Sequence, residues 1–304
     1  MSWIINNRRR LLRRMVQLSV IFLLMSPLFQ LPVFSGTLIS GTFFGINMVD
    51  PVAAMDYVLA TKSFYVPVMT GCGVLLALYF IVGGRAFCGW VCPMYLVSEL
   101  VAKLPGKWQA FSHTPGHSAK FWVLGVFLIL SLSTSQPVFE MVSPIGIISQ
   151  NVAMGIDPPS RSSANAAENI QGLEELGIRP SLLPENDSSY MILFNYSLWL
   201  LLSLVLIDIL VTRGWWCRYT CPIGAFYSIL GRFSPLKIMI DHDSCTKCGD
   251  CFAVCLPAEV LEAPVKGDTI WVNNGSCTNC LNCIDVCPEK SLRLGIRIAK
   301  EKRR

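Results

Sequence analysis

The chain has 304 residues and a formal net charge of +5; 53% of its residues are hydrophobic and only 15% are charged. A soluble globular domain carries about 25% charged residues, so this composition predicts that most of the chain lies in lipid. The positive charge lies mainly in the connections between apolar runs, which indicates a role in membrane topology and gives no reason to expect nucleic-acid binding.

Four apolar runs are long enough to be transmembrane helices, because about 20 apolar residues span the hydrocarbon core. They are residues 15–34, 66–84, 121–139 and 191–211. The first run could be a signal peptide, but no clean cleavage site follows it, so we interpret it as a retained helix. The predicted fold is therefore an α-helical membrane protein over residues 1–236, with four transmembrane helices arranged as two repeated hairpins.

Lysine and arginine in the connections predict the orientation of these helices. Five arginines precede the first run, and four positive residues lie within 85–120. The stretch 149–190 instead holds two arginines against six acidic residues. Because positive residues mark the cytoplasmic side, we expect a multi-pass protein of the bacterial inner membrane with its N-terminus and C-terminal domain in the cytoplasm.

A repeated motif follows the second and the fourth apolar run. Residues 84–93 read GRAFCGWVCP and residues 213–222 read RGWWCRYTCP. Tryptophan and arginine at such positions are typical membrane-interface anchors, but two free thiols in each repeat indicate shared chemistry. These C-x3-C-P cysteines are Cys88, Cys92, Cys217 and Cys221. Three interpretations are open: a metal or additional iron–sulfur site, a thiol–disulfide switch, or a docking surface for the C-terminal domain.

Two acidic residues in or beside the apolar runs are the candidate catalytic residues, because carboxylates in lipid are costly. Asp208 lies roughly 14 Å along a helix from Cys217, at 1.5 Å per residue. It either accepts a proton from a quinol or pairs with Arg85 or Arg213, and the pairing is the favoured interpretation. Glu140, at the end of the third run, has a similar ambiguity.

The C-terminal segment, residues 237–304, contains two runs of the form C-x2-C-x2-C-x3-C. In bacterial ferredoxins three closely spaced thiolates of such a run hold one 4Fe–4S cluster and the fourth ligates the other cluster. The first predicted cluster is held by Cys245, Cys248, Cys251 and Cys287. The second is held by Cys277, Cys280, Cys283 and Cys255. Zinc does not call for a third and a fourth cysteine at this spacing, and a reducing cytoplasm disfavours disulfides.

The segment between the two runs is typical of a small α+β ferredoxin domain. Residues 269–272 form a short strand-like stretch, and Asn273-Asn274-Gly275 is a turn signal. We therefore expect a C-terminal two-cluster bacterial-ferredoxin domain. Cys72, the one cysteine outside these motifs, is predicted to be an inert packing residue.

Taken together, four apolar runs, the motifs GRAFCGWVCP and WWCRYTCPIGAFYS, and the two-cluster tail resemble the NapH-type ferredoxin proteins. The resemblance covers nearly the whole chain, including Val49-Asp50-Pro51. The C-x3-C-P pair is shared with a wider group that includes a membrane regulator of nitrous oxide reductase and an oxidase-assembly ferredoxin. The small size of the chain argues against the regulator.

The resemblance implies a quinol dehydrogenase component of the periplasmic nitrate reductase system. Such a protein would take electrons from the membrane quinol pool and pass them to a NapG-type periplasmic iron–sulfur protein and a c-type cytochrome. A second class of function is also open, namely a redox maturation or assembly factor that supplies electrons or thiols to a partner metalloenzyme without quinol turnover. Clusters on the cytoplasmic side are difficult to reconcile with electron transfer to a periplasmic reductase, because the reductase lies across the membrane.

Overall fold

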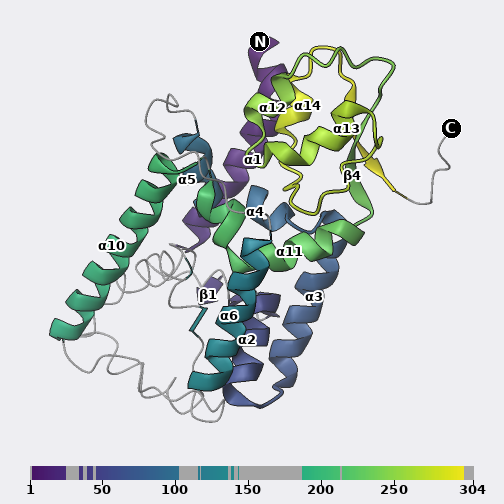
Figure 1. Ribbon diagram of the computed structural model, residues 1–304. Helices are drawn as coiled ribbons and strands as arrows, with labels where there is room; N and C mark the ends of the chain where they lie inside the picture. Colours follow the sequence, from purple (N-terminus) through teal and green to yellow (C-terminus); the bar gives the residue numbers. More distant parts are fainter. Residues whose placement is uncertain are drawn as a thin grey trace. The chain divides into compact units, whose positions relative to one another are not determined.

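The computed structural model describes residues 2–24, 34–36, 40–43, 46–102, 116, 118–135, 138–139, 143, 187–212 and 214–297 (Figure 1). The chain divides into two compact units. Unit 1 comprises Met1–Val20, Leu76–Leu124 and Ile207–Arg304, and unit 2 comprises Ile21–Leu75 and Gly125–Leu206. Every cysteine of the sequence motifs therefore belongs to unit 1.

The helices that coincide with the apolar runs are α1 (Ser2–Leu24), α3 (Val66–Val82), α6 (Ala119–Thr134) and α10 (Asp187–Leu210). Within the described ranges, none of them is both long enough and apolar enough to cross a membrane. With 17 and 16 residues, α3 and α6 are about 26 and 24 Å long, short of the roughly 30 Å hydrocarbon core.

Helix α1 differs from the prediction in its bounds. It begins at Ser2, so it contains the arginines that were expected to precede a span. Of α10, the side chains are described only from Leu198 onward. The predicted four transmembrane helices are therefore wrong, and the multi-pass inner-membrane location and orientation that rested on them are not supported.

Unit 2 contains a small sheet and a capped helix that the sequence did not predict. Strands β1 (Phe34–Gly36), β2 (Ser40–Phe43) and β3 (Ile46–Val49) form an antiparallel sheet in the order β1-β2-β3. Asp50 then caps α2 (Pro51–Thr61) by accepting a hydrogen bond from Val52 N at 2.9 Å. Buried Asp56 accepts hydrogen bonds from the Ser131 hydroxyl and the Phe139 amide. Cys72 is half-buried.

In unit 1, the C-terminal part is built on two antiparallel strands, β4 (Leu236–Ile240) and β5 (Leu292–Ile296), with Leu236 opposite Ile296. Residues 270–272 run along the other edge of β4, where Val272 N donates to Ile238 O at 2.9 Å. The strand expected at 269–272 is thus reduced to an isolated bridge between Trp271 and Met239.

Four short helical segments connect these strands, and each of them is close to the cysteine runs. They are α12 (Asp250–Val254), η5 (Ala258–Leu261), α13 (Glu262–Lys266) and α14 (Asn282–Val286). Figure 1 shows α12, α13 and α14 gathered beside β4. Their core is formed by Ile238, Ile240, Val260, Leu261, Val272, Cys283 and Leu292. Eight partly buried residues pack against it: Cys245, Cys251, Phe252, Cys255, Val265, Cys277, Ile284 and Cys287.

The two C-x3-C-P units have matching local structures. In the first, α4 (Ala86–Trp90) leads to α5 (Pro93–Val101); in the second, the π-helical turn η4 (Trp216–Thr220) leads to α11 (Pro222–Phe233). In each, the second cysteine is the extended residue before a helix whose first residue is proline. Proline suits this position because its missing N–H would have no helical partner there. Each first cysteine lies in the preceding helical turn, so the repeat seen in the sequence is also a structural repeat.

Candidate functional site

The two cysteine runs of the tail have the same backbone shape. Lys247 and Asn279 have φ values of 54° and 46°, and Gly249 and Leu281, two residues later, have φ values of 90° and 64°. Left-handed backbone costs a non-glycine residue roughly 1–2 kcal/mol, so this repetition marks a wrapped loop that the surrounding structure holds in place. The first two cysteines of each run lie in the loop, and the third lies in α12 or α14.

The cysteines assigned to the first cluster line one small cavity. Cys245, Cys248, Cys251 and Cys287 all contribute to its wall, together with apolar side chains such as Ile240 and Leu292. Cys248 is exposed, whereas the other three are half-buried. Burial, followed by the charge of Cys248, raises the pKa of the Cys251 thiol. The fold thus places the last cysteine of the second run with the first three of the first run.

The cysteines assigned to the second cluster also lie near one another. Burial raises the pKa of the Cys255 thiol, and the three neighbouring thiols raise it further. Those neighbours are Cys280, Cys277 and Cys283. Burial also raises the pKa of Cys277 to about 11. Since Cys255 ends the first run, the crossing of the two runs occurs in both directions.

Each set of four thiolates has the ligand chemistry of a 4Fe–4S cluster. In the part of the chain that the structure describes, no three Cys, His, Asp or Glu side chains are close enough together to hold one metal ion. Zinc needs its sulfur ligands about 2.3 Å from one centre. A 4Fe–4S cluster instead binds each thiolate to a different iron, so its ligands lie farther apart.

The C-x3-C-P cysteines form a third group of thiols in unit 1. Cys88, Cys92 and Cys217 are buried and Cys221 is half-buried. Burial, then the charge of Cys88, raises the pKa of Cys221 to about 12. Burial also raises the pKa of Cys217, with Asp208, Cys92, Cys221 and Cys88 adding to the shift. The two repeats therefore bring their thiols to one place.

Arg85 lies among these thiols and is only 2% exposed. Its guanidinium donates to Cys217 O at 2.7 Å and to Ser276 O at 3.1 Å, and it lies close enough to Cys88 and Cys217 for their charges to interact. None of the described carboxylates forms an ion pair with it. Burying a cation without a counter-charge is costly, so the site favours negatively charged sulfur ligands around Arg85. Through Ser276, the residue before Cys277, the same side chain reaches the second run.

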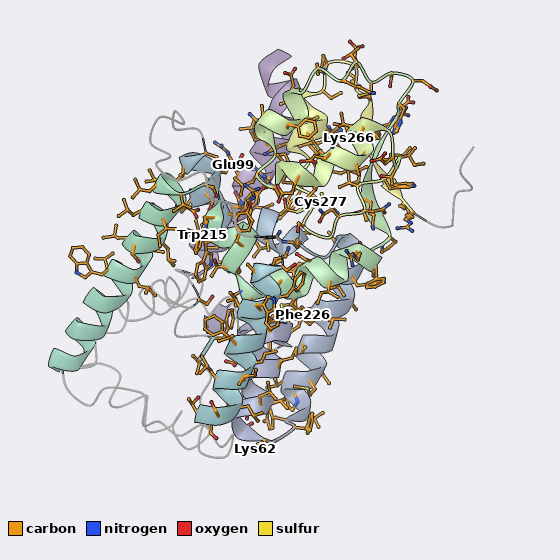
Figure 2. The ribbon with its side chains drawn as sticks, in the orientation of Figure 1. Lys62, Glu99, Trp215, Phe226, Lys266 and Cys277 are labelled. Carbon is orange, nitrogen blue, oxygen red and sulfur yellow. The ribbon has the colours of Figure 1, made fainter. Side chains whose placement is uncertain are left out.

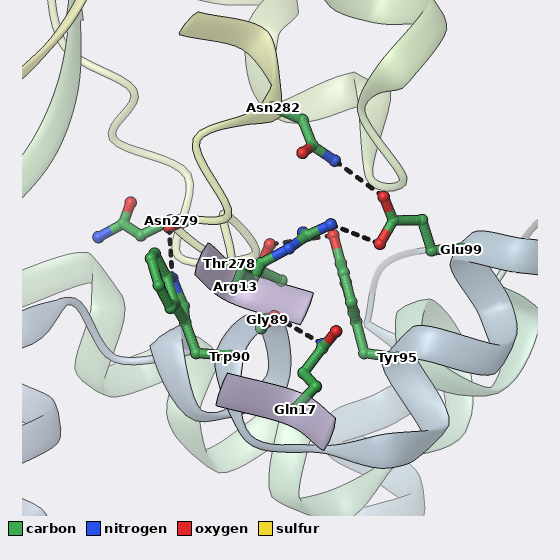
Figure 3. A network of polar contacts seen from close by, with 9 residues as sticks. All are labelled: Arg13, Gln17, Gly89, Trp90, Tyr95, Glu99, Thr278, Asn279 and Asn282. Carbon is green, nitrogen blue, oxygen red and sulfur yellow. Dashed lines mark hydrogen bonds and ion pairs between the residues drawn. The ribbon is translucent and has the colours of Figure 1, made fainter. Parts of the chain in front are cut away.

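Helix α1 and the first C-x3-C-P unit form a polar network with the second cysteine run (Figure 3). The Trp90 indole N–H donates to Asn279 O at 3.0 Å. Gln17 donates to Gly89 O at 3.0 Å. Gly89 is needed at this contact because an added Cβ would lie 2.9 Å from Thr278 O. The loop that carries Cys88 and Cys92 therefore packs directly against the loop that carries Cys277 and Cys280.

The second half of this network centres on Arg13, whose side chain is fully buried. Arg13 forms an ion pair with Glu99, and Glu99 also accepts a hydrogen bond from Asn282 Nδ2 at 3.4 Å. The Arg13 guanidinium lies 5.6 Å from the centre of the Tyr95 ring. Its Nε and Nη1 atoms have no hydrogen-bond partner among the described residues. Glu99 and Cys277 can be located among the side chains of this unit in Figure 2.

Asp208 does not have the partner that was expected. Its carboxylate accepts a hydrogen bond from Ser98 Oγ at 2.5 Å and one from Trp216 N at 3.1 Å. Burial raises its pKa. Arg85 instead donates to the backbone carbonyls of Ser276 and Cys217, so the predicted Asp208–Arg85 pair is not formed. Glu140 and Arg213 lie outside the described residues.

Comparison with known proteins supports an iron–sulfur function for the C-x3-C-P segments and for the C-terminal cysteine runs. A family model described as a 4Fe-4S binding domain matches residues 66–111 and 193–240, which contain the C-x3-C-P units. A model described as a 4Fe-4S dicluster domain matches residues 237–288. The ferredoxin-type protein NapH of Haemophilus influenzae is 26% identical over 88% of this chain and 81% of its own length. NapH of Escherichia coli is 27% identical over 87% and 80%.

The resemblance to NapH-type ferredoxin proteins is confirmed. A second set of relatives is equally similar: the methylamine utilization ferredoxin-type protein MauN of Methylobacillus flagellatus is 29% identical over 85% of this chain and 80% of its own length. No solved structure matches the chain. The NapH and MauN relatives and the 4Fe–4S domains identify a ferredoxin-type electron-transfer protein that acts with electron-transfer partners.

Proposed function

We propose that this chain relays single electrons from a quinol to an iron–sulfur partner. The observation that carries the proposal is the grouping of the tail cysteines into two sets of four, with the loop between Cys277 and Cys280 packed against the loop between Cys88 and Cys92. A quinol releases two electrons, whereas a 4Fe–4S cluster carries one at a time. Two clusters in one unit suit this conversion from a two-electron donor to one-electron acceptors.

Each set of four tail cysteines would hold one cluster. Cys245, Cys248, Cys251 and Cys287 would hold the first cluster, and Cys277, Cys280, Cys283 and Cys255 would hold the second. The exposed Cys248 makes the first cluster the better exit to a protein partner, because electron transfer between proteins needs a cluster near the surface. In the second set Cys280 and Cys283 are buried and the other two cysteines are half-buried, so this set suits an internal position in the relay.

We further propose that Cys88, Cys92, Cys217 and Cys221 hold an additional iron–sulfur centre. The 4Fe-4S binding domain model matches the two segments that contain them and ends before Cys245. The buried Arg85 supports the proposal, because its charge would offset the negative charge of a thiolate-bound cluster. Its hydrogen bonds to Ser276 O and Cys217 O would also hold this centre in a fixed position relative to the second cluster.

For the partners, we propose a path to periplasmic nitrate reductase through a NapG-type iron–sulfur protein and a c-type cytochrome, which the NapH relatives support. The similar identity of the MauN relatives supports a different terminal oxidoreductase as the alternative. A redox maturation factor is the second candidate function, and the buried thiol group favours it if those cysteines remain free thiols.

Reduction of the clusters by quinol tests the proposal. The full chain, loaded with iron and sulfide anaerobically, would be mixed with menadiol or decylubiquinol, and cluster reduction would be followed by visible absorbance and EPR. We expect reduction with two electrons taken up per quinol. Clusters that dithionite reduces and neither quinol reduces would exclude the quinol relay and favour the maturation role.

A further inference from the structure

Unit 1 contains a cavity of about 1010 Å³ next to the second cysteine run. Its walls come from α3, α6, α11 and residues 273–276, with Arg297 at its edge. Ser276 lines the cavity and directly precedes Cys277, so their Cα atoms are about 3.8 Å apart. A molecule in this cavity would therefore lie next to the second predicted cluster. The cavity is at the upper end of the usual size of about 300–1,000 Å³ for small-molecule sites.

The cavity combines apolar walls with a few buried polar groups. Phe80, Phe121 and Phe233 supply aromatic surface. Lys120 is 2% exposed, and its ammonium donates to Ser228 Oγ at 2.8 Å and Ser276 Oγ at 2.7 Å. The hydroxyl of Ser234 is buried and has no hydrogen-bond partner within the described ranges. A buried hydroxyl without a partner costs about 1–3 kcal/mol, which a bound acceptor or donor would recover.

We propose that this cavity binds the ring of a quinone or quinol. A quinone ring is flat and largely apolar, which suits the phenylalanine walls, and it carries two oxygen atoms that need hydrogen-bonding partners. Ser234 can bond one oxygen, and the Lys120–Ser276 pair can bond the other. The inference rests on the proposed quinol relay and adds to it the place where the donor binds.

The reaction at this site balances as a two-electron oxidation. The two O–H bonds of the quinol break, two protons pass to water, and the ring becomes the quinone. The quinol would supply two electrons, one for each centre of the tail. Cys277, Cys280, Cys283 and Cys255 would hold the centre nearer to Ser276, and Cys245, Cys248, Cys251 and Cys287 would hold the other. Both electrons are thus accounted for by the two centres of the tail.

The cavity also carries two arginines, Arg232 and Arg297, which a phosphate-bearing ligand would use. A neutral quinone has little need of them, because its oxygens bond to hydroxyl and ammonium groups deeper in the cavity. This difference separates the two ligand classes. The double variant Arg232→Gln/Arg297→Gln should leave quinone binding almost unchanged, whereas it should weaken binding of inorganic phosphate.

Filling the cavity provides the main test. Ile229 lines it and is 48% exposed, so Ile229→Trp adds bulk there without disturbing the core. Leu294, on β5, is 43% exposed and does not line it, so Leu294→Trp is the matched control. Menadione binding to the cluster-loaded chain would be measured by equilibrium dialysis. We expect Ile229→Trp to weaken binding by at least about tenfold and Leu294→Trp to leave it unchanged.

The same variants distinguish failure of this inference from failure of the relay. If menadiol reduces the clusters of wild type and Ile229→Trp equally, the relay stands and the cavity is not the quinone site. If menadione binds wild type but not Ile229→Trp, while menadiol reduces no cluster, the site stands and the relay is excluded. Phosphate binding without menadione binding would overturn the inference in favour of an anion site.

Discussion

The indole N–H of Trp90 donates to the backbone carbonyl of Asn279 at 3.0 Å, which joins the first C-x3-C-P unit to the loop between Cys277 and Cys280. Replacing Trp90 with Phe keeps an aromatic ring but removes the donor, and a typical hydrogen bond contributes about 1 kcal/mol. We expect a lower thermal midpoint and an altered EPR signal of the second cluster. Trp122→Phe is the control, because Trp122 is 77% exposed. Equal midpoints and unchanged EPR spectra in both variants would show that the Trp90 hydrogen bond contributes neither to stability nor to the surroundings of the second cluster.

The crossing of the two cysteine runs gives a second prediction. The loaded chain should contain about eight irons in its two tail clusters. Cys255→Ser should damage the same cluster as Cys283→Ser, because Cys255 lies with the second run. Cys251→Ser should damage the other cluster. Iron content and the EPR spectrum of each variant would be compared with those of Cys72→Ser. Loss of the same signal in Cys255→Ser and Cys251→Ser would contradict the crossed assignment.

The cysteines of the second prediction were identified from the sequence. Cysteine spacing is a local pattern with a direct chemical meaning, so the sequence alone predicted the groups to be tested. The apolar runs likewise predicted helices in the correct places at α3, α6 and α10. They did not predict the helix ends: α3 stops at Val82, before Gly83 and Gly84 with positive φ, and α6 stops at Thr134, before Ser135 with a φ of 53°. The domain boundary placed at residue 237 stays a prediction.

Charge was the less reliable guide. Arg13, Arg85 and Lys120 were interpreted as markers of membrane topology, yet in the structure all three are at most 2% exposed and take part in specific contacts. Their partners are far away in sequence: Arg13 pairs with Glu99, and Lys120 bonds Ser228 and Ser276. No periodicity or motif marks such contacts. Buried cations near cysteine motifs could therefore be recognised only after folding was known.

Arg13 provides a third prediction, because it is close enough to Cys280 for their charges to interact. A buried cation stabilises the more negative, reduced form of a neighbouring cluster. The double variant Arg13→Gln/Glu99→Gln removes the cation without leaving its carboxylate partner unpaired. We expect the reduction potential of the second cluster to fall by roughly 60 mV, which corresponds to about 1.4 kcal/mol.

An EPR-monitored redox titration would measure that shift. Arg9→Gln is the control, because the Arg9 side chain is 42% exposed and its charge is therefore better screened by water. If the Arg13→Gln/Glu99→Gln variant and the Arg9→Gln variant lower the reduction potential of the second cluster equally, burial of Arg13 has no special effect on that cluster.

Lys120 gives a prediction about pH. Burial, followed by the charge of Arg85, lowers the pKa of Lys120 to about 7 from its usual 10.5. Between these two values the unfolded chain binds more protons than the folded chain, so stability should rise as the pH increases from 7 towards 10.5. Thermal midpoints would be recorded across this window for wild type and Lys120→Gln. The variant should lack this part of the rise. Parallel curves would mean that Lys120 does not titrate near neutral pH.

The last prediction concerns the four C-x3-C-P cysteines. If Cys88, Cys92, Cys217 and Cys221 hold one iron–sulfur centre, removing any one thiolate damages that same centre. Single serine variants should then lose similar amounts of iron, and Cys88→Ser/Cys217→Ser should be little worse than either single variant. Such non-additivity is typical of residues that act as a unit. If each thiol instead packs independently, each serine should be a mild change of about 1 kcal/mol, and the effects should add.

Iron content and quinol-driven reduction of the tail clusters would be measured in each variant, with protein levels checked so that instability is not mistaken for lost chemistry. Cys72→Ser is the matched control, because Cys72 is half-buried and belongs to no motif. The geometry makes a shared loss the expected outcome: Arg85 directly precedes the first C-x3-C-P helical turn and donates to Cys217 O in the second repeat. Four variants with wild-type iron and wild-type reduction would exclude a centre there and leave the two tail clusters as the redox centres of the described chain.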